Sequence, residues 1–464
     1  MADVHPVGSQ RLPAGVFVVT ASHSTADVAD DAAHRWLGDF AIDSAAHRSP
    51  FHEFAAHVDV HTLDVQEFVV DSCDARRVWS HGFAPLGAVL MRRVVAPPRL
   101  HWRHAVEEIG FTYHTIDGDI YWDEAGWYEF SLPEIERLET ATNELHQLCL
   151  QAVQHVLDRE RWDEFLIPPA CRDWIRASWD ADDPTVYGRF DFAYDGSGPP
   201  KLLEYNADTP TALFESAVVQ WNWLEAVHPK LDQFNSLHER LIETWRDLQG
   251  RGLSRLLFSA TEGHEEDFGN VTYLRDTAAQ GGISTDYLDV SSIGYDPLQQ
   301  TFVDERGAAI EWLFKLYPWE WMVQEEFGQH LLTAATEWLE PPWKMLLSNK
   351  ALLVVLWELF PDCEYLLPAG WNPIGRDYVR KPLLSREGSN IQLVQRGMVQ
   401  RETQGPYADQ PAVYQAYHPL AFSGGRHAVI GSWIVGDTAC GIGIREDENP
   451  ITHNLSRFIP HVIG

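Results

Sequence analysis

The chain of 464 residues lacks the features that mark membrane and secreted proteins. No apolar run approaches the ~18 residues that a membrane-spanning helix needs. The first ten residues, MADVHPVGSQ, carry neither a basic segment nor a long apolar one, so no secretory leader is apparent. We therefore predict a cytoplasmic protein without a membrane partner.

Cysteine is scarce and scattered. The five cysteines are Cys73, Cys149, Cys171, Cys363 and Cys440. Their number is odd and no pair has CxxC spacing, which argues against a disulfide framework and against a zinc site. Buried, unreactive thiols are the simpler interpretation, although the count alone leaves a catalytic thiol open.

Basic charge is also scarce. The chain has 35 Lys and Arg against 68 Asp and Glu, which gives a net charge of −33. This balance makes DNA or RNA an unfavourable main partner. An acidic surface instead attracts cationic small molecules such as amines.

Lysine is especially rare. The lysines are Lys201, Lys230, Lys315, Lys344, Lys350 and Lys381. Because an ammonium group and a guanidinium group differ in geometry and hydration, the two residues are not freely exchanged. Lysines kept by a chain that otherwise uses arginine are therefore candidate site residues.

The common nucleotide-binding motifs are missing. The chain has no GxxxxGK[ST] loop and no GxGxxG that opens a helix. The segment GIGIRED holds GxG, but Arg445 follows it and helical signals do not. Any nucleotide site must therefore be built in another way.

Apolar and aromatic residues are abundant, at 45% hydrophobic with 19 Trp and 21 Phe, so a large core is expected. Apolar spacing predicts helices over residues 132–160, 209–229, 265–282 and 343–361, with Pro210 near the first turn of the second. Strands are predicted over residues 254–260, 377–384, 412–420 and 426–446. This mixture predicts an α+β or mixed α/β fold.

Residues 1–90 differ from the rest. Eight of the 21 histidines fall there, including His57 and His61, but partner ligands for a metal are not evident. Met91 could itself be a start codon. We predict an N-terminal extension of unknown role over residues 1–90, either a small domain or an over-extended gene product, and a main domain over residues 91–464.

The segment RFDFAYDGSGPPKLLEYN predicts a hairpin that gathers polar groups on one face. If the turn is symmetric about residues 197 and 198, Asp191 lies opposite Glu204 and Arg189 lies opposite Asn206. Phe190, Phe192, Leu203 and Tyr205 would then share the other face. Directly opposed carboxylates repel, so removal of one should relieve repulsion when no metal is bound.

Two interpretations of this polar face stay open. Carboxylate and amide oxygens are ligands that Mg²⁺ prefers, and Arg189 would add a donor for a phosphate or a carboxylate. Alternatively, the face is solvated and Arg189 simply bridges the acids. The hairpin alone does not decide between them.

Further basic residues stand in short polar breaks beside apolar elements. Lys350 lies near a predicted helix start, and Lys381 lies at the end of a predicted strand. Arg386 follows in a glycine-bearing loop, PLLSREGSN, that could bring backbone N–H groups to an anion. The strand around Gln415 could offer backbone groups to an adenine edge. Each of these signals is weak alone.

Together and in this order, these segments resemble the glutathionylspermidine synthase family. The resemblance is carried by YGRFDFAYDGSGPPKLLEYNADTPT, SNKALL, YVRKPLLSREGSN, GSWIVGD and GIGIRED followed by LSRF. It covers about Met91 to Gly464 and implies an ATP-grasp-like synthetase domain over residues 91–464. Such enzymes phosphorylate a carboxylate with ATP, and an amine then displaces the phosphate.

The resemblance also implies roles for single residues. It implies Mg²⁺ ligands at Asp191, Glu204 and Asn206. It implies phosphate-steadying arginines at Arg189, Arg386 and, on a mobile lid, Arg445. It implies ATP-binding residues at Lys350, Lys381, Gln415, Ala416 and Tyr417.

Other family features are matched less well. Bifunctional relatives carry a cysteine amidase, but no amidase motif surrounds Cys73, so we predict none. Glu265 and Glu266 lie roughly where the family places acids near the amine, and as adjacent strand-end carboxylates they could recruit a polyamine. A solvated acidic turn is an equal alternative.

The resulting prediction is an ATP- and Mg²⁺-dependent ligase that joins a peptide or amino-acid carboxylate to an amine. Two alternatives stay open: a phosphotransferase without an amine acceptor, and a non-catalytic ATP-binding protein. The sequence does not name the substrates.

Overall fold

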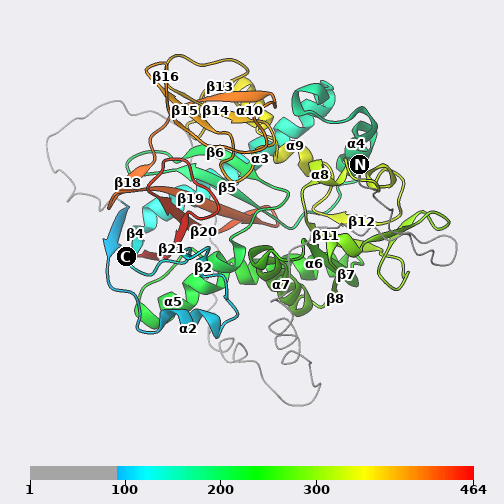
Figure 1. Cartoon of the computed structure of the whole chain (residues 1–464), viewed down its shortest axis with the longest axis horizontal. Helices are drawn as coiled ribbons and strands as arrows, with labels where there is room; N and C mark the ends of the chain where they lie inside the picture. Colours follow the sequence, from blue (N-terminus) through cyan, green and yellow to red (C-terminus); the bar gives the residue numbers. More distant parts are fainter. Residues whose placement is uncertain (1–90) are drawn as a thin grey trace, which may run out of the picture. The chain divides into compact units, whose positions relative to one another are not determined.

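A computed structural model describes residues 91–464. The predictions for the N-terminal extension, for His57 and His61 and for Cys73 lie outside these residues. Within them, helices alternate with parallel and antiparallel strands, so the expected mixed α/β fold is confirmed (Figure 1). No helix in residues 91–464 is both long and apolar enough to cross a membrane.

The largest sheet of the described residues has six strands in the order β21-β20-β19-β5-β6, with β18 beside β19. Its strands are β5 (Tyr187–Ala193), β6 (Lys201–Asn206), β18 (Ala421–Ser423), β19 (Arg426–Val435), β20 (Thr438–Asp447) and β21 (Arg457–Ile459). Every pairing in this sheet is antiparallel.

A five-stranded antiparallel sheet carries two predicted ATP-binding residues, Lys381 and Gln415. Its strands are β13 (Ala369–Gly370), β17 (Ala412–Ala416), β14 (Tyr378–Pro382), β15 (Gln392–Gln395) and β16 (Met398–Glu402). Side chains of this sheet bond to the backbone of β6: the Gln415 amide donates to the Leu202 carbonyl over 2.9 Å. The two sheets therefore meet at β6.

The remaining sheets are smaller. A parallel sheet holds β12 (Glu337–Leu339), β11 (Trp312–Leu316), β7 (Arg255–Ala260) and β8 (Ser284–Tyr287). A three-stranded sheet joins β1 (Arg92–Val95), β4 (Gly126–Phe130) and β22 (His461–Ile463). Two-stranded pairs are formed by β2 (Thr115–Ile116) with β3 (Asp119–Ile120), and by β9 (Gly294–Asp296) with β10 (Thr301–Val303).

The α-helices of the described residues are α2 (Trp102–Glu107), α3 (Leu132–Asp158), α4 (Arg172–Asp180), α5 (Gln220–Val227), α6 (Leu237–Gly250), α7 (Glu265–Gln280), α8 (Trp319–Met322), α9 (Lys344–Leu347) and α10 (Ala351–Leu359). A π-helical segment, Glu215–Val219, precedes α5, and short 3-10 turns occupy Trp162–Phe165, Pro169–Cys171, Val290–Ser292 and Gly328–His330.

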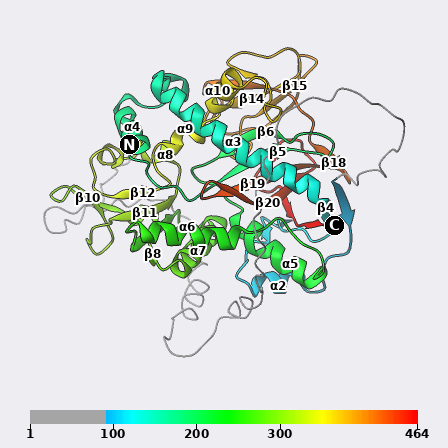
Figure 2. The same cartoon turned by 180° about the vertical axis from the view of Figure 1, so that it is seen from behind.

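The long helix α3 covers one face of the six-stranded sheet (Figure 2). A capping box between Ser131 and Glu134 begins it, and its apolar face supplies buried residues such as Leu138 and Leu145. The Thr142 hydroxyl lies 2.7 Å from the Ser432 hydroxyl of β19. Because side chains alternate along a strand, the neighbours of Ser432 project to the opposite face.

Two helix predictions need correction. The helix predicted over residues 343–361 is two helices, because residues 348–350 break the apolar run between α9 and α10. The helix predicted over residues 209–229 excludes Pro210, and its middle is the π-helical segment Glu215–Val219. Periodicity alone did not reveal a single wider turn inside an otherwise helical pattern.

Candidate active site

The hairpin of β5 and β6 has the predicted register. Asp191 pairs with Glu204, and Arg189 pairs with Asn206. A bulge after Asp191 then shifts the ladder, so that Phe192 pairs with Leu202. The prediction that Leu203 shares the apolar face is therefore wrong: Leu202 is fully buried in that core, because a bulge adds one residue to one strand.

The polar face of the hairpin is partly buried, and Glu204 keeps 31% of its side chain exposed. The Arg189 guanidinium donates to both oxygens of Asp191, over 2.7 and 3.1 Å, and the two side chains are only 11% and 13% exposed. The Asn206 amide donates to Asp191 over 3.3 Å and to Glu204 over 3.4 Å. Arg189 therefore binds Asp191 and the Thr211 carbonyl, and it does not bridge the two acids, because Glu204 is paired with Lys350 instead.

Lys350 approaches this cluster from the start of α10. It is the residue before the helix, and its ammonium lies 3.1 Å from Glu204 and donates to the Ser385 carbonyl over 2.6 Å. Burial alone would raise the pKa of Glu204, but the ammonium groups of Lys350 and Lys381 outweigh it and lower the pKa to about 2. Glu204 is therefore ionised at neutral pH.

Lys381 enters from β14, as predicted. Its ammonium donates to the Leu203 carbonyl and to the Gln415 side chain, both over 2.7 Å. Burial lowers the pKa of Lys381 to about 8, although Glu204 opposes the shift. The ammonium is therefore more readily deprotonated than an exposed one.

The three residues predicted to contact adenine, Gln415, Ala416 and Tyr417, already make hydrogen bonds within the protein. The Gln415 side chain is occupied by Lys381 and by β6, the Ala416 N–H bonds to Pro368, and the Tyr417 N–H bonds to Asp377. The N–H groups of Ala416 and Tyr417 are thus already used within the protein. The roles of these three residues in ATP binding stay a prediction.

Arg386 lies in the loop between β14 and β15. Its guanidinium contacts Glu320 of α8 over 2.8 and 2.9 Å and donates to the Thr209 hydroxyl over 2.7 Å. Burial would lower the pKa of Arg386, but the carboxylates of Glu320 and Asp208 outweigh it and raise the pKa above its ordinary value. Neither Glu320 nor Thr209 carried a sequence signal for this contact.

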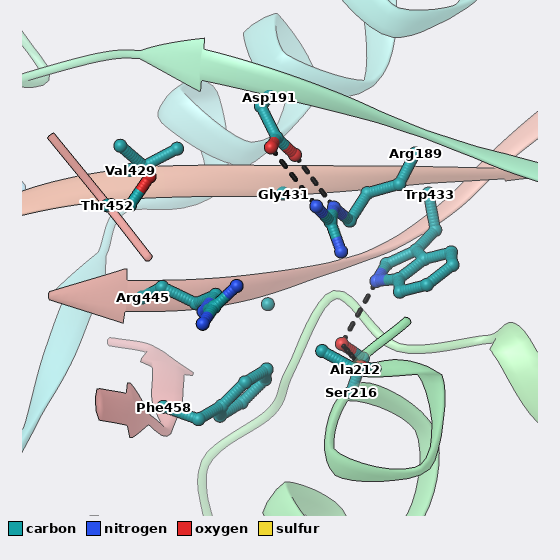
Figure 3. A pocket seen from close by; sticks show the side chains of 11 residues that line it. Arg189, Asp191, Ala212, Ser216, Val429, Gly431, Trp433, Arg445, Thr452 and Phe458 are labelled. Atoms are coloured by element: carbon teal, nitrogen blue, oxygen red, sulfur yellow. Dashed lines mark hydrogen bonds and ion pairs between the residues drawn. The ribbon is translucent and has the colours of Figure 1, made fainter. Parts of the chain in front are cut away.

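Arg445 and Arg189 share one pocket on the face of the sheet away from α3 (Figure 3). The pocket is lined by Arg189, Asp191, Ala212, Ser216, Val429, Gly431, Trp433, Gly443, Arg445, Thr452 and Phe458. Arg445 donates to the carbonyls of His453 and Asn454 over 2.5 and 2.9 Å, while its buried Nε has no partner. An unpaired N–H of a cation is a donor available to an anion.

Arg445 lies in a paired strand, and its expected place on a mobile lid stays a prediction. Arg445 lies within β20 and pairs with Val429 on one side and Phe458 on the other. A Cβ on Gly443 would lie 2.5 Å from the Ser216 hydroxyl and 2.7 Å from the Phe458 ring. The glycine therefore permits close packing beneath the pocket.

Comparison with known proteins identifies the chain. The family model described as glutathionylspermidine synthase preATP-grasp matches residues 93–464. A Haemophilus influenzae protein named as an acid–amine ligase is 43% identical over 390 residues, which cover 80% of this chain and 99% of that protein. The chain belongs to the glutathionylspermidine synthase family. As a member of this family it is an ATP-dependent C–N ligase.

Two longer relatives are more distant from this glutathionylspermidine synthase family member. Trypanothione synthetase of Crithidia fasciculata is 28% identical over 398 residues, covering 77% of this chain and 57% of that protein. The bifunctional glutathionylspermidine synthetase/amidase of Escherichia coli is 27% identical over 371 residues, covering 73% and 59%. The chain thus spans less than two thirds of each of these relatives.

The two acids predicted to recruit an amine, Glu265 and Glu266, lie at the start of helix α7. Glu265 and Glu266 follow β7 as the first residues of α7, where carboxylates are favoured by the helix dipole, and so they are not strand-end residues. Glu265 is exposed, whereas the charge of Glu266 helps to raise the pKa values of Glu215 and Asp267. The charge of Glu266 therefore acts on two acids near the site.

Two acids near the site escaped the sequence analysis. Burial raises the pKa of Glu215 to about 8, and the Tyr121 hydroxyl donates to one of its oxygens over 2.7 Å. Burial likewise raises the pKa of Asp267 to about 7. Glu215 stands beside the pocket residue Ser216 in the π-helical segment, a conformation that recurs at functional sites.

The hairpin ligand set fits a hard divalent cation in its chemistry. In residues 91–464 no three His, Cys, Asp or Glu side chains gather as a metal site, so any Mg²⁺ would rest on two carboxylates and one amide. Burial raises the pKa of Asp191 above its ordinary value although Arg189 opposes the shift. Additional positive charge beside Asp191 would therefore be favourable.

Proposed function

We propose that the protein is an ATP- and Mg²⁺-dependent carboxylate–amine ligase that forms an amide through an acylphosphate. The observation that carries this proposal is the convergence of Arg189, Lys350 and Lys381 on the Asp191–Glu204 hairpin. Buried cations of this kind suit a polyphosphate, and the paired acids suit its metal ion.

The arrangement suggests a division of labour among the proposed residues. Asp191, Glu204 and Asn206 would hold Mg²⁺, which would neutralise phosphate charge when bound. Lys350 and Lys381 would bind the phosphates of ATP as point charges, while the forked guanidinium of Arg386 would contact the transferring phosphate. No side-chain nucleophile is required, because positioning and charge stabilisation supply most of the catalysis in phosphoryl transfer.

The pocket of Arg189 and Arg445 suits the carboxylate or the acylphosphate made from it. The unpaired Nε of Arg445 and the guanidinium of Arg189 would face the negative charge that develops there. Donors held in place before reaction stabilise such charge without further reorganisation. Phosphate would leave when an amine attacks the activated carbonyl carbon.

The substrates are proposed only as classes. The names of the relatives point to glutathione as a carboxylate and to a polyamine as an amine. Glu265 and Glu266 on α7 would attract an ammonium group to the rim of the site. A net charge of −33 favours the same kind of substrate.

The experiment is a search for condensed products. The protein is incubated with ATP, Mg²⁺, glutathione and spermidine, and in parallel with pooled carboxylates and amines, and products are found by mass spectrometry. Release of ADP that requires the amine supports the ligase. ADP release with a phosphorylated carboxylate and no amine requirement would instead establish the phosphotransferase alternative, and no ADP release with any mixture would refute both.

A further inference from the structure

The turn that follows the β5–β6 hairpin contacts two of the three proposed phosphate arginines, Arg189 and Arg386. This turn, residues 207–211, connects Asn206 of β6 to the pocket residue Ala212. The Thr209 hydroxyl accepts from Arg386 over 2.7 Å, and the Thr211 carbonyl accepts from Arg189 over 2.6 Å. The position of this turn therefore affects the position of two guanidinium groups, one on β5 and one in the loop between β14 and β15.

The turn is held by a buried ion pair that the proposed chemistry does not use directly. Asp208 accepts from the Lys315 ammonium over 2.6 Å, and each side chain is 1% exposed. The other oxygen of Asp208 accepts the Trp319 N–H over 3.0 Å at the start of α8. The Lys315 ammonium also lies 4.1 Å from the centre of the Trp319 ring.

These contacts close a ring. Asp208 holds the first residue of α8, and the next residue of that helix, Glu320, holds Arg386. Arg386 returns to Thr209, the neighbour of Asp208. The ring thus fixes Arg386 from two sides, and the Asp208 carboxylate contributes to both. The Ser348 hydroxyl supports the turn as well, since it accepts from the N–H groups of Ala207 and Asp208 over 3.1 and 2.7 Å.

Stability alone is a weak reason for this pair. Transfer of two charges out of water has a large cost, and apolar replacements of similar volume are often as stable or more stable. Burial lowers the pKa of Lys315 below its ordinary value, although Asp208 opposes the shift. We therefore explain the buried Asp208–Lys315 pair by the geometry that it fixes at the proposed active site, and not by a contribution to folding stability.

We propose that Asp208 and Lys315 are positioning residues that fix the 207–211 turn and, through it, hold Arg386 and Arg189 in place for phosphoryl transfer. This inference rests on the proposed function. A shift of reacting groups by about 1 Å can cost on the order of 10²-fold in rate. Asp208→Asn should therefore lower kcat by roughly 10–100-fold and leave the ATP Kd within about threefold.

The structure offers a matched control pair. Lys344 and Glu340 are also 2.6 Å apart, and their side chains are 3% and 0% exposed. The Glu340 side chain accepts from the backbone N–H groups of Val186 and Tyr187. The backbone carbonyl of Glu340 accepts from the Trp319 indole, and the Tyr187 hydroxyl donates to the Pro210 carbonyl, but Glu340→Gln removes neither of these two bonds. Glu340→Gln should therefore lower the melting temperature much as Asp208→Asn does, without the loss of kcat.

The test compares Asp208→Asn, Lys315→Met, their double variant, Glu340→Gln and Thr209→Val. Kinetics use the condensing substrates found in the product search, at a temperature where every variant is folded. Thr209→Val removes the acceptor for Arg386 without touching the ion pair, so it stays informative if a charge variant does not fold. The double variant should lose no more kcat than the worse single variant, because the two residues act as one unit.

Amide hydrogen exchange gives a second readout that needs no turnover. Asp208→Asn should speed exchange in residues 206–211 and in the loop 383–391, whereas Glu340→Gln should not. If the parental protein forms no condensed product, the proposed function fails, and the exchange experiment still decides the coupling. Unchanged exchange in the loop 383–391, or a kcat that falls equally in Glu340→Gln, would overturn the positioning role.

Discussion

The variant Arg445→Ala tests two contributions of Arg445 separately, one to protein stability and one to catalysis. In the unliganded protein Arg445 makes two hydrogen bonds to the carbonyls of His453 and Asn454. At roughly 0.5–1.5 kcal/mol net for each bond, their loss should destabilise the protein by about 1–3 kcal/mol. The fold should survive, because β20 keeps its backbone pairing on both sides.

The effect on the reaction should be larger. Removal of a single donor to a developing negative charge typically costs about 10²–10³-fold in kcat, equivalent to roughly 2.7–4 kcal/mol. We expect kcat and kcat/KM to fall together, since the interaction is made mainly in the transition state, while the ATP Kd changes little. Arg445→Lys should recover only part of the rate, because an ammonium group lacks the second arm of the guanidinium fork.

The assay is ADP release under saturating substrates, with ATP affinity measured separately by calorimetry and stability by thermal unfolding. Arg161→Ala is the matched control, since Arg161 is similarly buried and bonds to Glu164 and Glu358 but does not line the pocket. It should lose stability and keep kcat. A near-parental kcat in Arg445→Ala would show that Arg445 only anchors the 448–456 loop.

Three further predictions concern other parts of the site. Asp191→Asn should abolish ATP turnover, and parental turnover in this variant would rule out the hairpin site. It should also destabilise the metal-free protein by roughly 1.5–3 kcal/mol, because Arg189 loses its charged partner. This sign is opposite to the relief of repulsion that the sequence analysis predicted. Lys381 has a pKa of about 8 and is charged below that pH, so the ATP Kd measured by calorimetry should rise as the pH increases through 8. Lys381→Arg should flatten this pH profile, because the guanidinium stays charged. Identical pH profiles for the parental protein and the variant would show that Lys381 does not bind phosphate. A chain that starts at Met91 should fold and keep ligase activity, since the Met91 nitrogen already bonds to Glu134 over 2.6 Å; loss of solubility or activity would show that residues 1–90 complete the core or the site.

The hairpin could be predicted from the sequence because its determinants are local. Period-two alternation and a short turn placed Asp191 opposite Glu204, and the structure has that pairing. The bulge that buries Leu202 in place of Leu203 could not be predicted, since it depends on how the strand packs against the core. The end of α9 and the start of α10 were also missed, because a polar break in an apolar run is compatible with one helix or with two.

The arginine contacts could not be predicted, because they join residues that are distant in sequence. Arg386 bonds to Thr209 and Glu320, which lie 177 and 66 positions away. Arg445 reaches the pocket of Arg189 only through the register of β19 against both β5 and β20. The resemblance supplied these positions as a set, but their partners follow from tertiary packing, which one sequence does not specify.

The glycines of β20 show how the same local signal can have two physical causes. The resemblance implied a mobile lid at Arg445, and glycines such as Gly441 and Gly443 can give a moving segment the backbone freedom it needs. In the structure the space beside Gly443 is filled by Ser216 and Phe458, and Gly441 is approached by Leu237. A glycine is required in both cases, either by an unusual backbone angle or by a neighbour that leaves no room for a Cβ. Here the neighbours of Gly441 and Gly443 account for both glycines by close packing. Arg445 lines the pocket from a strand that is paired on both sides, while it holds two carbonyls of the 448–456 loop.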